Sequence, residues 1–132
     1  DYDIIILDCP PNISTLSENV FRAADCIVVP VIPTTLSEHT FEQLIEFFRD
    51  NKLQRKKILP FFSMMQRTKK LHCETVERMK KDYPKRFLDT TIAFSAEIEK
   101  MGVNRAPVAA YAARNKVGEA YDNLHSDVME RL

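Results

Sequence analysis

Four apolar runs along the chain have the length and composition of β-strands. They cover residues 3–7 (DIIIL), 26–31 (CIVVPV), 58–65 (ILPFFSMM) and 87–93 (FLDTTIA), and the last run is the most mixed. Runs that stay apolar at consecutive positions are typical of strands buried on both faces of a parallel sheet. Prolines follow the first two runs closely and mark their ends, because proline cannot extend a sheet ladder.

Segments with helical periodicity separate these runs. Two capping-box patterns, Thr15-x-x-Glu18 and Thr35-x-x-Glu38, each predict the start of a helix, and the first helix should end near Ala24. The apolar stripe of the second helix consists of Phe41, Leu44, Ile45 and Phe48. Each helix therefore has one face suited to packing on a sheet.

The second half of the chain continues the alternation. Thr68 is positioned to cap a third helix, whose apolar face would consist of Val76, Met79 and Tyr83. We expect a loop through Gly102 and Pro107, followed by a long final helix over residues 116–132. Strands that alternate with helices predict an α/β fold with a mostly parallel sheet flanked by helices.

Composition narrows the class of protein. The 132 residues are 45% hydrophobic and 29% charged, which fits a single globular domain or most of one. No apolar run approaches the roughly 20 residues that cross a bilayer. The three cysteines form no CxxC pair, as expected in a reducing cytosol. The first residues have neither an initiator methionine nor the basic start of a signal peptide, so we expect Asp1 to be an internal residue of a longer chain or a trimmed one.

The net charge is zero, but it is unevenly distributed. Residues 49–86 contain 13 lysines and arginines against 4 acidic residues, a net charge of +9, and the remainder carries −9. Such asymmetry can mark contact with an acidic partner such as nucleic acid or a membrane surface, although solvated helix faces produce the same pattern.

The sharpest local signal is a strand followed by Asp8-x-Pro10-Pro11. Open α/β sheets bind ligands beyond the carboxyl ends of their strands, which is where Asp8 is expected. A lone carboxylate there suits Mg²⁺, which keeps several of its waters. Two other interpretations remain open: Asp8 caps the following turn, or Cys9 is a nucleophile activated by a nearby helix N-terminus.

Residues 2–44 strongly resemble the ParA partition ATPases, a branch of the deviant-Walker ParA/MinD-type P-loop family. The carrying segments are YDIIILDCPP, then AADCIVVPV, then a helix with a glutamate near its start. Weaker likeness continues through SMMQRTKK, through TTIAFSAEIEKMGVNRAPV and into GEAY. The resemblance implies that residues 1–132 are the C-terminal portion of a P-loop NTPase domain of the SIMIBI type.

The family's site residues map onto only a few positions of this chain. The resemblance implies that Asp8 holds Mg²⁺ through a water and that Pro10 and Pro11 form a mobile switch. It places the adenine of ATP near two strand ends, at Ser63, Met64, Ile92, Ala93 and Phe94. Two departures from the family weaken the adenine assignment: Ala93 stands where proline is frequent, and Arg105-Ala106-Pro107 replaces Gly-Lys-Pro.

A phosphate-binding loop needs several glycines next to a lysine and a Ser or Thr. Gly102 and Gly118 are the only glycines, and neither is next to such a lysine. The resemblance places the loop and its strand before Asp1, so we predict that this chain alone does not hydrolyse ATP. Since the P-loop strand lies between residues 3–7 and 26–31 in this family, we also predict exposed strand edges there.

The resemblance gives the basic segment a role in nonspecific DNA binding, which should weaken steeply with salt. The candidate contacts are Arg67, Lys69, Lys70, Arg78, Lys80, Lys81, Lys85 and Arg86. It further implies a homodimer in the ATP-bound state, a ParB-type partner protein and a cytoplasmic, nucleoid-associated location. No membrane contact is expected, because the chain ends in mixed charge (DVMERL) rather than in a basic amphipathic tail.

Two further functions fit the same residues. One is a MinD-like or other cargo-positioning ATPase, and the other is a non-enzymatic α/β interaction module, which the missing phosphate loop favours. The sequence names neither the cargo nor the partner that stimulates hydrolysis.

Overall fold

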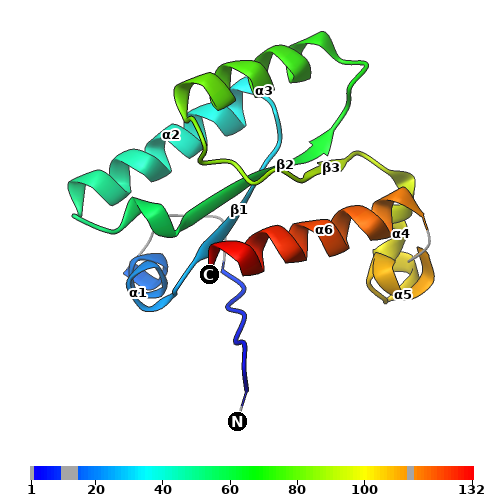
Figure 1. Cartoon of the computed structure of the whole chain (residues 1–132), viewed down its shortest axis with the longest axis horizontal. Coiled ribbons are helices and arrows are strands. Elements are labelled where there is room, and N and C mark those ends of the chain that lie inside the picture. Colours follow the sequence, from blue (N-terminus) through cyan, green and yellow to red (C-terminus); the bar gives the residue numbers. More distant parts are fainter. Residues whose placement is uncertain (1, 10–14, 113–114) are drawn as a thin grey trace.

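The computed structural model describes residues 2–9, 15–112 and 115–132 of the chain. Within them a three-stranded parallel sheet lies between two layers of helices, with strand order β1 (Ile27–Val31), β2 (Ile58–Met65) and β3 (Thr91–Ala93). The predicted α/β class with a parallel sheet flanked by helices is confirmed. Figure 1 shows α2 (Thr35–Asp50) and α3 (Lys70–Asp82) on one side of the sheet and α6 (Lys116–Arg131) on the other.

Strand β2 is the centre of both cores because its side chains alternate between the two faces. Ile58 and Phe62 pack with residues of α2 and α3, among them Phe48 and Met79. Leu59 and Phe61 point the other way, into a smaller cluster that contains residues of α6. Burial on both faces explains why this run is continuously apolar.

Phe87 extends the larger core from the segment that follows α3. Its ring is stacked on Phe62, with centroids 4.2 Å apart and an interplanar angle of 3°. Leu88 enters the other core, and its backbone N–H donates to the carbonyl of Pro60 at 2.8 Å. The predicted strand over residues 87–93 is therefore confirmed only for Thr91–Ala93; residues 87 and 88 pack like strand residues but do not form a continuous ladder.

Residues 3–7 correct a further prediction, because no strand forms there. The large apolar side chains of this segment are exposed, Ile6 at 88%. Figure 1 shows the segment projecting away from the sheet. A strand requires a neighbour for its backbone groups, and in the described residues the nearest edge, β1, is paired only with β2.

The other edge of β1 carries no strand in the described part of the chain, as expected if a strand position next to it is empty. Val29 and Val31 face the larger core, but Val28 is 42% exposed on the opposite face. That face of β1 extends beyond the cover of α6, whose contacts with the sheet are mainly to β3.

Helix positions follow the predicted pattern, with three corrections. α1 (Thr15–Ala23) and α6 match their predicted segments closely. α2 is capped by Thr34 rather than Thr35, since the Thr34 hydroxyl accepts from the N–H of Ser37 at 3.3 Å. α3 begins after Lys69 and has no side-chain cap, so the cap predicted at Thr68 is wrong.

The third correction is the loop predicted through Gly102 and Pro107. This region contains α4 (Ala96–Asn104) and α5 (Val108–Ala112). Ser95 starts α4 by accepting from the N–H of Glu97, and Arg105 ends it in the left-handed conformation with φ 47°. Gly102 is tolerated inside α4 despite its low helix propensity, and Pro107 stands directly before α5 rather than in a loop.

Candidate functional site

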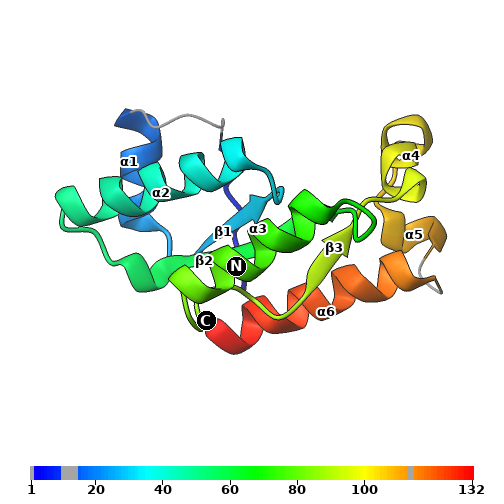
Figure 2. The ribbon, with the colours of Figure 1, turned by 90° about the horizontal axis from the view of Figure 1, so that it is seen from above.

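The carboxyl ends of β1, β2 and β3 meet at one edge of the sheet because the strands are parallel. Helices α2, α3 and α4 each begin just after one of these strands, so their N-termini gather at the same edge (Figure 2). Helix N-termini offer free N–H groups and a partial positive charge. This edge is therefore the part of the fold best suited to an anionic ligand.

Ser63 and Met64 end β2 at this edge, beside the end of β3. Met64 is unusual because it has φ 53°, a left-handed conformation that is uncommon for residues other than glycine. The β2–β3 register shifts between Phe62 and Met65, a bulge that includes Met64, and Met64 is 42% exposed. Bulges re-aim side chains next to functional sites.

Residues 92–94 lie next to this bulge. The N–H of Phe94 donates to the carbonyl of Met65 at 3.0 Å, which brings the two strand ends together. Ala93 and Phe94 are exposed, whereas Ile92 is buried at 1% exposure within the core. Four of the five candidate adenine residues thus share an accessible edge, and Ile92 supports it from beneath.

A turn after β2 is held by two side chains that the sequence did not single out for this purpose. The buried His72 accepts at Nδ1 from the N–H of Gln66 at 3.2 Å, and Cys73 Sγ donates to the carbonyl of Arg67 at 3.4 Å. Both residues lie in the first turn of α3, so they fix its N-terminus against β2. The only indication of this role in the sequence was that His72 and Cys73, two polar side chains, stand next to each other.

The same turn borders a hollow of about 310 Å³ on the α3 side of the edge. It is lined by Met65, Arg67, Cys73, Val76, Glu77, Lys80 and Thr91. Two of the candidate DNA-contacting residues, Arg67 and Lys80, therefore border this hollow together with the end of β2.

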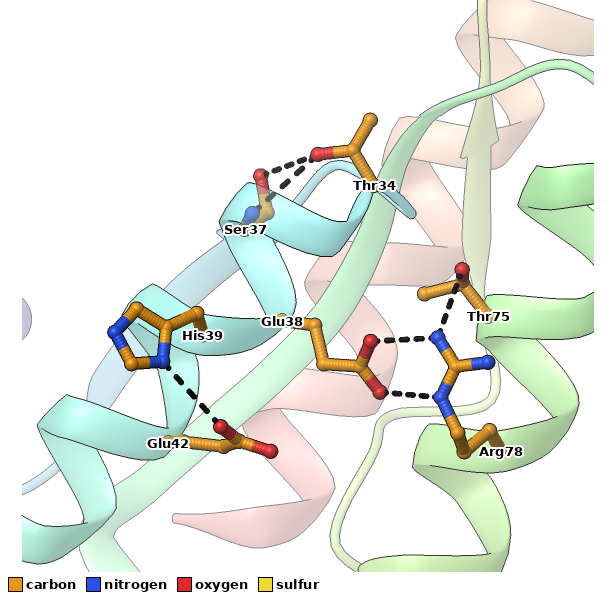
Figure 3. Close-up of polar contacts among 7 residues, drawn as sticks. All are labelled: Thr34, Ser37, Glu38, His39, Glu42, Thr75 and Arg78. Carbon is orange, nitrogen blue, oxygen red and sulfur yellow. Dashed lines mark hydrogen bonds and ion pairs between the residues drawn. The ribbon is translucent and has the colours of Figure 1, made fainter.

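Arg78 differs from the other candidate cations because it holds α3 to α2. Its Nε and Nη2 donate to the two carboxylate oxygens of Glu38 at 2.7 and 2.6 Å, and Nη2 also donates to the Thr75 hydroxyl at 3.3 Å (Figure 3). The hydrogen bonds from Arg78 lower the pKa of Glu38, and those to Glu38 raise the pKa of Arg78. Glu38 was expected to complete a capping box and instead forms this inter-helix pair.

The remaining candidate cations separate into two groups along α3. Arg67, Lys69 and Lys70 lie at its N-terminus, and Lys70 pairs with Glu74 at 3.4 Å. Lys80 and Lys81 lie in its last turn and are exposed, and Lys85 and Arg86 follow it. Since a helix rises about 1.5 Å per residue, its 13 residues separate the two groups by roughly 20 Å.

Asp8 is exposed in the segment that projects from the sheet. No hydrogen bond or ion pair in the described part of the chain joins it to residues 63–64 or 92–94, so the structure does not bring these candidates together. Pro10 and Pro11 lie outside the described residues. As a single accessible carboxylate Asp8 fits Mg²⁺, which needs only one or two protein carboxylates.

Other site classes find little support in the residues that the structure describes. They contain no group of three His, Cys, Asp or Glu side chains placed to hold a metal. All three cysteines are free, and burial followed by the charge of Asp25 raises the pKa of Cys26. Among these residues Cys9 has no histidine partner; its thiol lies 3.7 Å from the carbonyl oxygen of Leu7. None of the described helices is both long and apolar enough for a membrane span.

Comparison with known proteins gives one family. A model described as an AAA domain matches residues 1–61. The chain is 25% identical to the sporulation initiation inhibitor protein Soj of Bacillus subtilis, over 97% of this chain and 52% of Soj. It is 22% identical to the chromosome partitioning protein ParA of Myxococcus xanthus and 24% identical to the cell division protein PomZ of the same organism, each over 99% of this chain.

These alignments cover 48% of that ParA and 42% of PomZ, so the chain spans about half the length of the curated relatives it matches. The matches run through all three strands and the six helices of the described residues. The parallel sheet flanked by helices agrees with the P-loop NTPase fold that the sequence predicted. These matches support a likeness of the chain to the ParA-type P-loop ATPases.

Proposed function

We propose that residues 1–132 are the C-terminal portion of an ATPase for chromosome or plasmid partitioning. Relatives named for chromosome partitioning align with nearly the whole chain, and this alignment is the observation that carries the proposal. The intact protein binds Mg-ATP at the carboxyl edge of the sheet. Adenine contacts Ser63, Met64, Ala93 and Phe94, while Ile92 supports them.

Asp8 holds a water of the Mg²⁺ ion in this proposal, and Pro10 and Pro11 form the switch that follows it. The metal, when bound, neutralises charge on the phosphates and polarises them for attack. Asp8 contributes a carboxylate that orients the metal's water. Its exposed position fits a residue that completes its site only when a phosphate-binding loop lies beside it.

The proposal is tested in a form of the protein in which a glycine-rich phosphate loop precedes Asp1. We expect Asp8→Asn to lower Mg²⁺-dependent ATP hydrolysis by about 10- to 100-fold, the usual cost of losing a group that orients a metal's ligands. Asp122→Asn, which alters an exposed carboxylate on α6, is the matched control and should retain activity. Equal activity of the Asp8 and Asp122 variants would exclude the metal-orienting role.

In its ATP-bound state the protein forms a homodimer, responds to a ParB-type partner and binds DNA without sequence preference. The exposed cations Arg67, Lys69, Lys70, Lys80, Lys81 and Lys85 supply phosphate contacts, with Arg86 at the end of the series. Arg78 contributes least, because Glu38 already neutralises it. Gel shifts of the intact protein at low salt, with and without Lys80→Glu/Lys81→Glu, test this surface. Unchanged DNA binding by the double variant would contradict the assignment of these cations to DNA contact.

A second candidate is an ATPase that positions another cargo, since PomZ, a protein named for cell division, aligns with 99% of the chain. The ATP site would be the same in both cases. A gene deletion distinguishes the two proposed functions. Loss of a partitioning ATPase should misplace the origin region of the chromosome, whereas loss of an ATPase for cell division should misplace the division site.

A further inference from the structure

Met64 keeps a backbone conformation that a methionine rarely adopts. Its φ of 53° lies in the left-handed region, which costs free energy for a residue that has a Cβ. Such conformations persist only where the surrounding structure fixes them, and they are concentrated at functional sites. The contacts that hold Met64 in this conformation therefore bear on what the carboxyl edge of the sheet can bind.

Two hydrogen bonds fix the backbone directly after Met64. The carbonyl of Met65 accepts from the N–H of Phe94 at 3.0 Å, and the N–H of Gln66 donates to Nδ1 of His72 at 3.2 Å. The first bond ties the end of β2 to the residue after β3, and the second ties it to the first turn of α3. Both residues that follow Met64 are therefore restrained, each by a different element.

His72 is an unusual residue for its position. It lies on the buried face of α3 with Thr75 and Met79, and it is only 5% exposed. An apolar side chain there would avoid the cost of burying a polar ring. Because a backbone N–H can only donate, Nδ1 of His72 carries a lone pair, which places the ring proton on Nε2. The ring therefore serves the turn after β2 as a hydrogen-bond acceptor.

Cys73 contacts the same turn at a point farther from Met64. Its Sγ donates to the carbonyl of Arg67 at 3.4 Å. A thiol is a weak donor, whereas the ring nitrogen of His72 accepts directly from the backbone of Gln66. His72 is accordingly the side chain of α3 that is best placed to control the conformation of Met64.

We propose that His72 is a positioning residue for the nucleotide base. By fixing Gln66 it keeps Met64 left-handed, and Met64 in turn presents an accessible surface at the carboxyl edge. His72 does not touch the base, because its own side chain is buried. The inference rests on the proposed function, which places adenine at Met64, and it adds the residue that shapes this part of the site from within α3.

The first measurement follows hydrogen exchange of the Gln66 amide in residues 1–132. His72→Leu keeps a bulky side chain but has no acceptor, so this amide should exchange about 5-fold faster or more. His72→Asn is the rescue variant, because its side-chain oxygen is bonded to Cγ, as Nδ1 of histidine is. It should restore the protection of the unaltered chain. Equal protection of the Gln66 amide in His72→Leu and in the unaltered chain would overturn the proposal.

The second measurement compares the affinities for ATP and for inorganic tripolyphosphate in a form that carries a glycine-rich phosphate loop before Asp1. His72→Leu should weaken ATP binding by about 10-fold and leave tripolyphosphate binding unchanged, because only ATP has a base. His72→Asn should bind both ligands as the unaltered form does. Thr75→Val removes another buried polar group from the same face of α3, so it controls for a general loss of stability and should change neither affinity.

The outcomes separate this inference from the proposed function. Equal weakening of ATP and tripolyphosphate binding in His72→Leu, or an unchanged ATP affinity, would overturn the role of His72 alone. Equal affinity of the unaltered longer form for the two ligands would overturn the base site of the proposed function, and this inference with it. If His72→Leu does not fold, His72→Gln takes its place; its amide is bonded to Cδ rather than Cγ, and it should show the same loss.

Discussion

Residues 3–7 and strand β2 are built from similar bulky apolar side chains, but they lie in opposite environments. Phe62 in β2 is 0% exposed, enclosed in the larger core with residues of α2 and α3 and stacked on Phe87, whereas Ile6 is 88% exposed. Apolar composition alone thus does not make a strand. A strand requires an adjacent edge for its backbone and covered faces for its side chains, and only β2 has both within these residues.

Hydrogen exchange should show the largest difference between the two regions. Amides of β2 should exchange only through global unfolding, and those of residues 3–7 at rates near those of a free peptide. Given ordinary domain stabilities, the protection should differ by at least about 10³-fold. In a form that carries the phosphate-loop strand, residues 3–7 should become protected. Protection of residues 3–7 in the 132-residue chain would contradict the comparison.

Phe62→Ala tests the energetic side of the comparison. It removes a ring that is stacked on Phe87 and fully enclosed, so the free energy of unfolding should fall by about 3–5 kcal/mol. Ile6→Ala, a truncation of another large apolar residue, should change it by less than about 0.5 kcal/mol. Urea denaturation followed by circular dichroism measures both variants, and comparable losses would refute the contrast.

Helix α6 packs on the face of β2 that carries Leu59 and Phe61, and its stability depends partly on the cap at its first turn. The Asn115 side chain accepts from the N–H groups of Val117 and Gly118 at 2.9 and 3.0 Å. Asn115→Ala should therefore lower the free energy of unfolding by about 1 kcal/mol. Asn115→Asp, which keeps a capping oxygen, is the control and should stay close to the unaltered chain in the same urea titration.

Glu38→Gln tests the ion pair that joins α2 and α3, the two helices on the opposite face of β2. Arg78 depresses the pKa of folded Glu38 below its ordinary value of 4.5, so the stabilisation is present above that pH and is lost as pH falls through the folded pKa. The unaltered chain should consequently lose its advantage over Glu38→Gln in acid. The effect should be small, because the Arg78 side chain is 46% exposed to solvent.

Glu42→Gln serves as the control for this pH series. Glu42 lies on the same helix and is half-exposed, with His39 3.6 Å away rather than an arginine of another helix. Thermal unfolding midpoints should give parallel pH profiles for this variant and the unaltered chain. If the pH profile of Glu42→Gln matched that of Glu38→Gln, the ion pair between Glu38 and Arg78 would not be the cause of the pH dependence.

The sequence predicted those elements whose environment is encoded locally. The bounds of β2 match the apolar run, and the helical spacing of α6 matches its buried side. Residues 3–7 were wrongly expected to form a strand because pairing depends on a partner that no local pattern reveals. Helices α4 and α5 were not predicted, because Gly102 and Pro107 favour a loop more strongly than the capping residue Ser95 favours a helix.

For the candidate site, strand ends could be predicted and side-chain partners could not. The apolar run that ends at Met65 correctly placed residues 63 and 64 near the end of a strand. The left-handed conformation of Met64 and the β2–β3 bulge could not be predicted, because they follow from packing between strands. Glu38 looked like a local cap, and its bidentate contact with Arg78 spans 40 positions. The contacts of Arg86 with the Arg55 carbonyl and of Arg131 with the Lys85 carbonyl likewise span 31 and 46 positions.

The most direct measurement is ATP hydrolysis by residues 1–132 alone, compared with Asp8→Ala in the same chain and with a form that also carries a glycine-rich phosphate loop. The account predicts that the 132-residue chain shows no more hydrolysis than its Asp8→Ala variant, and that the longer form hydrolyses ATP in an Asp8-dependent manner. Hydrolysis by residues 1–132 above the Asp8→Ala level, or Asp8-independent hydrolysis by the longer form, would contradict it.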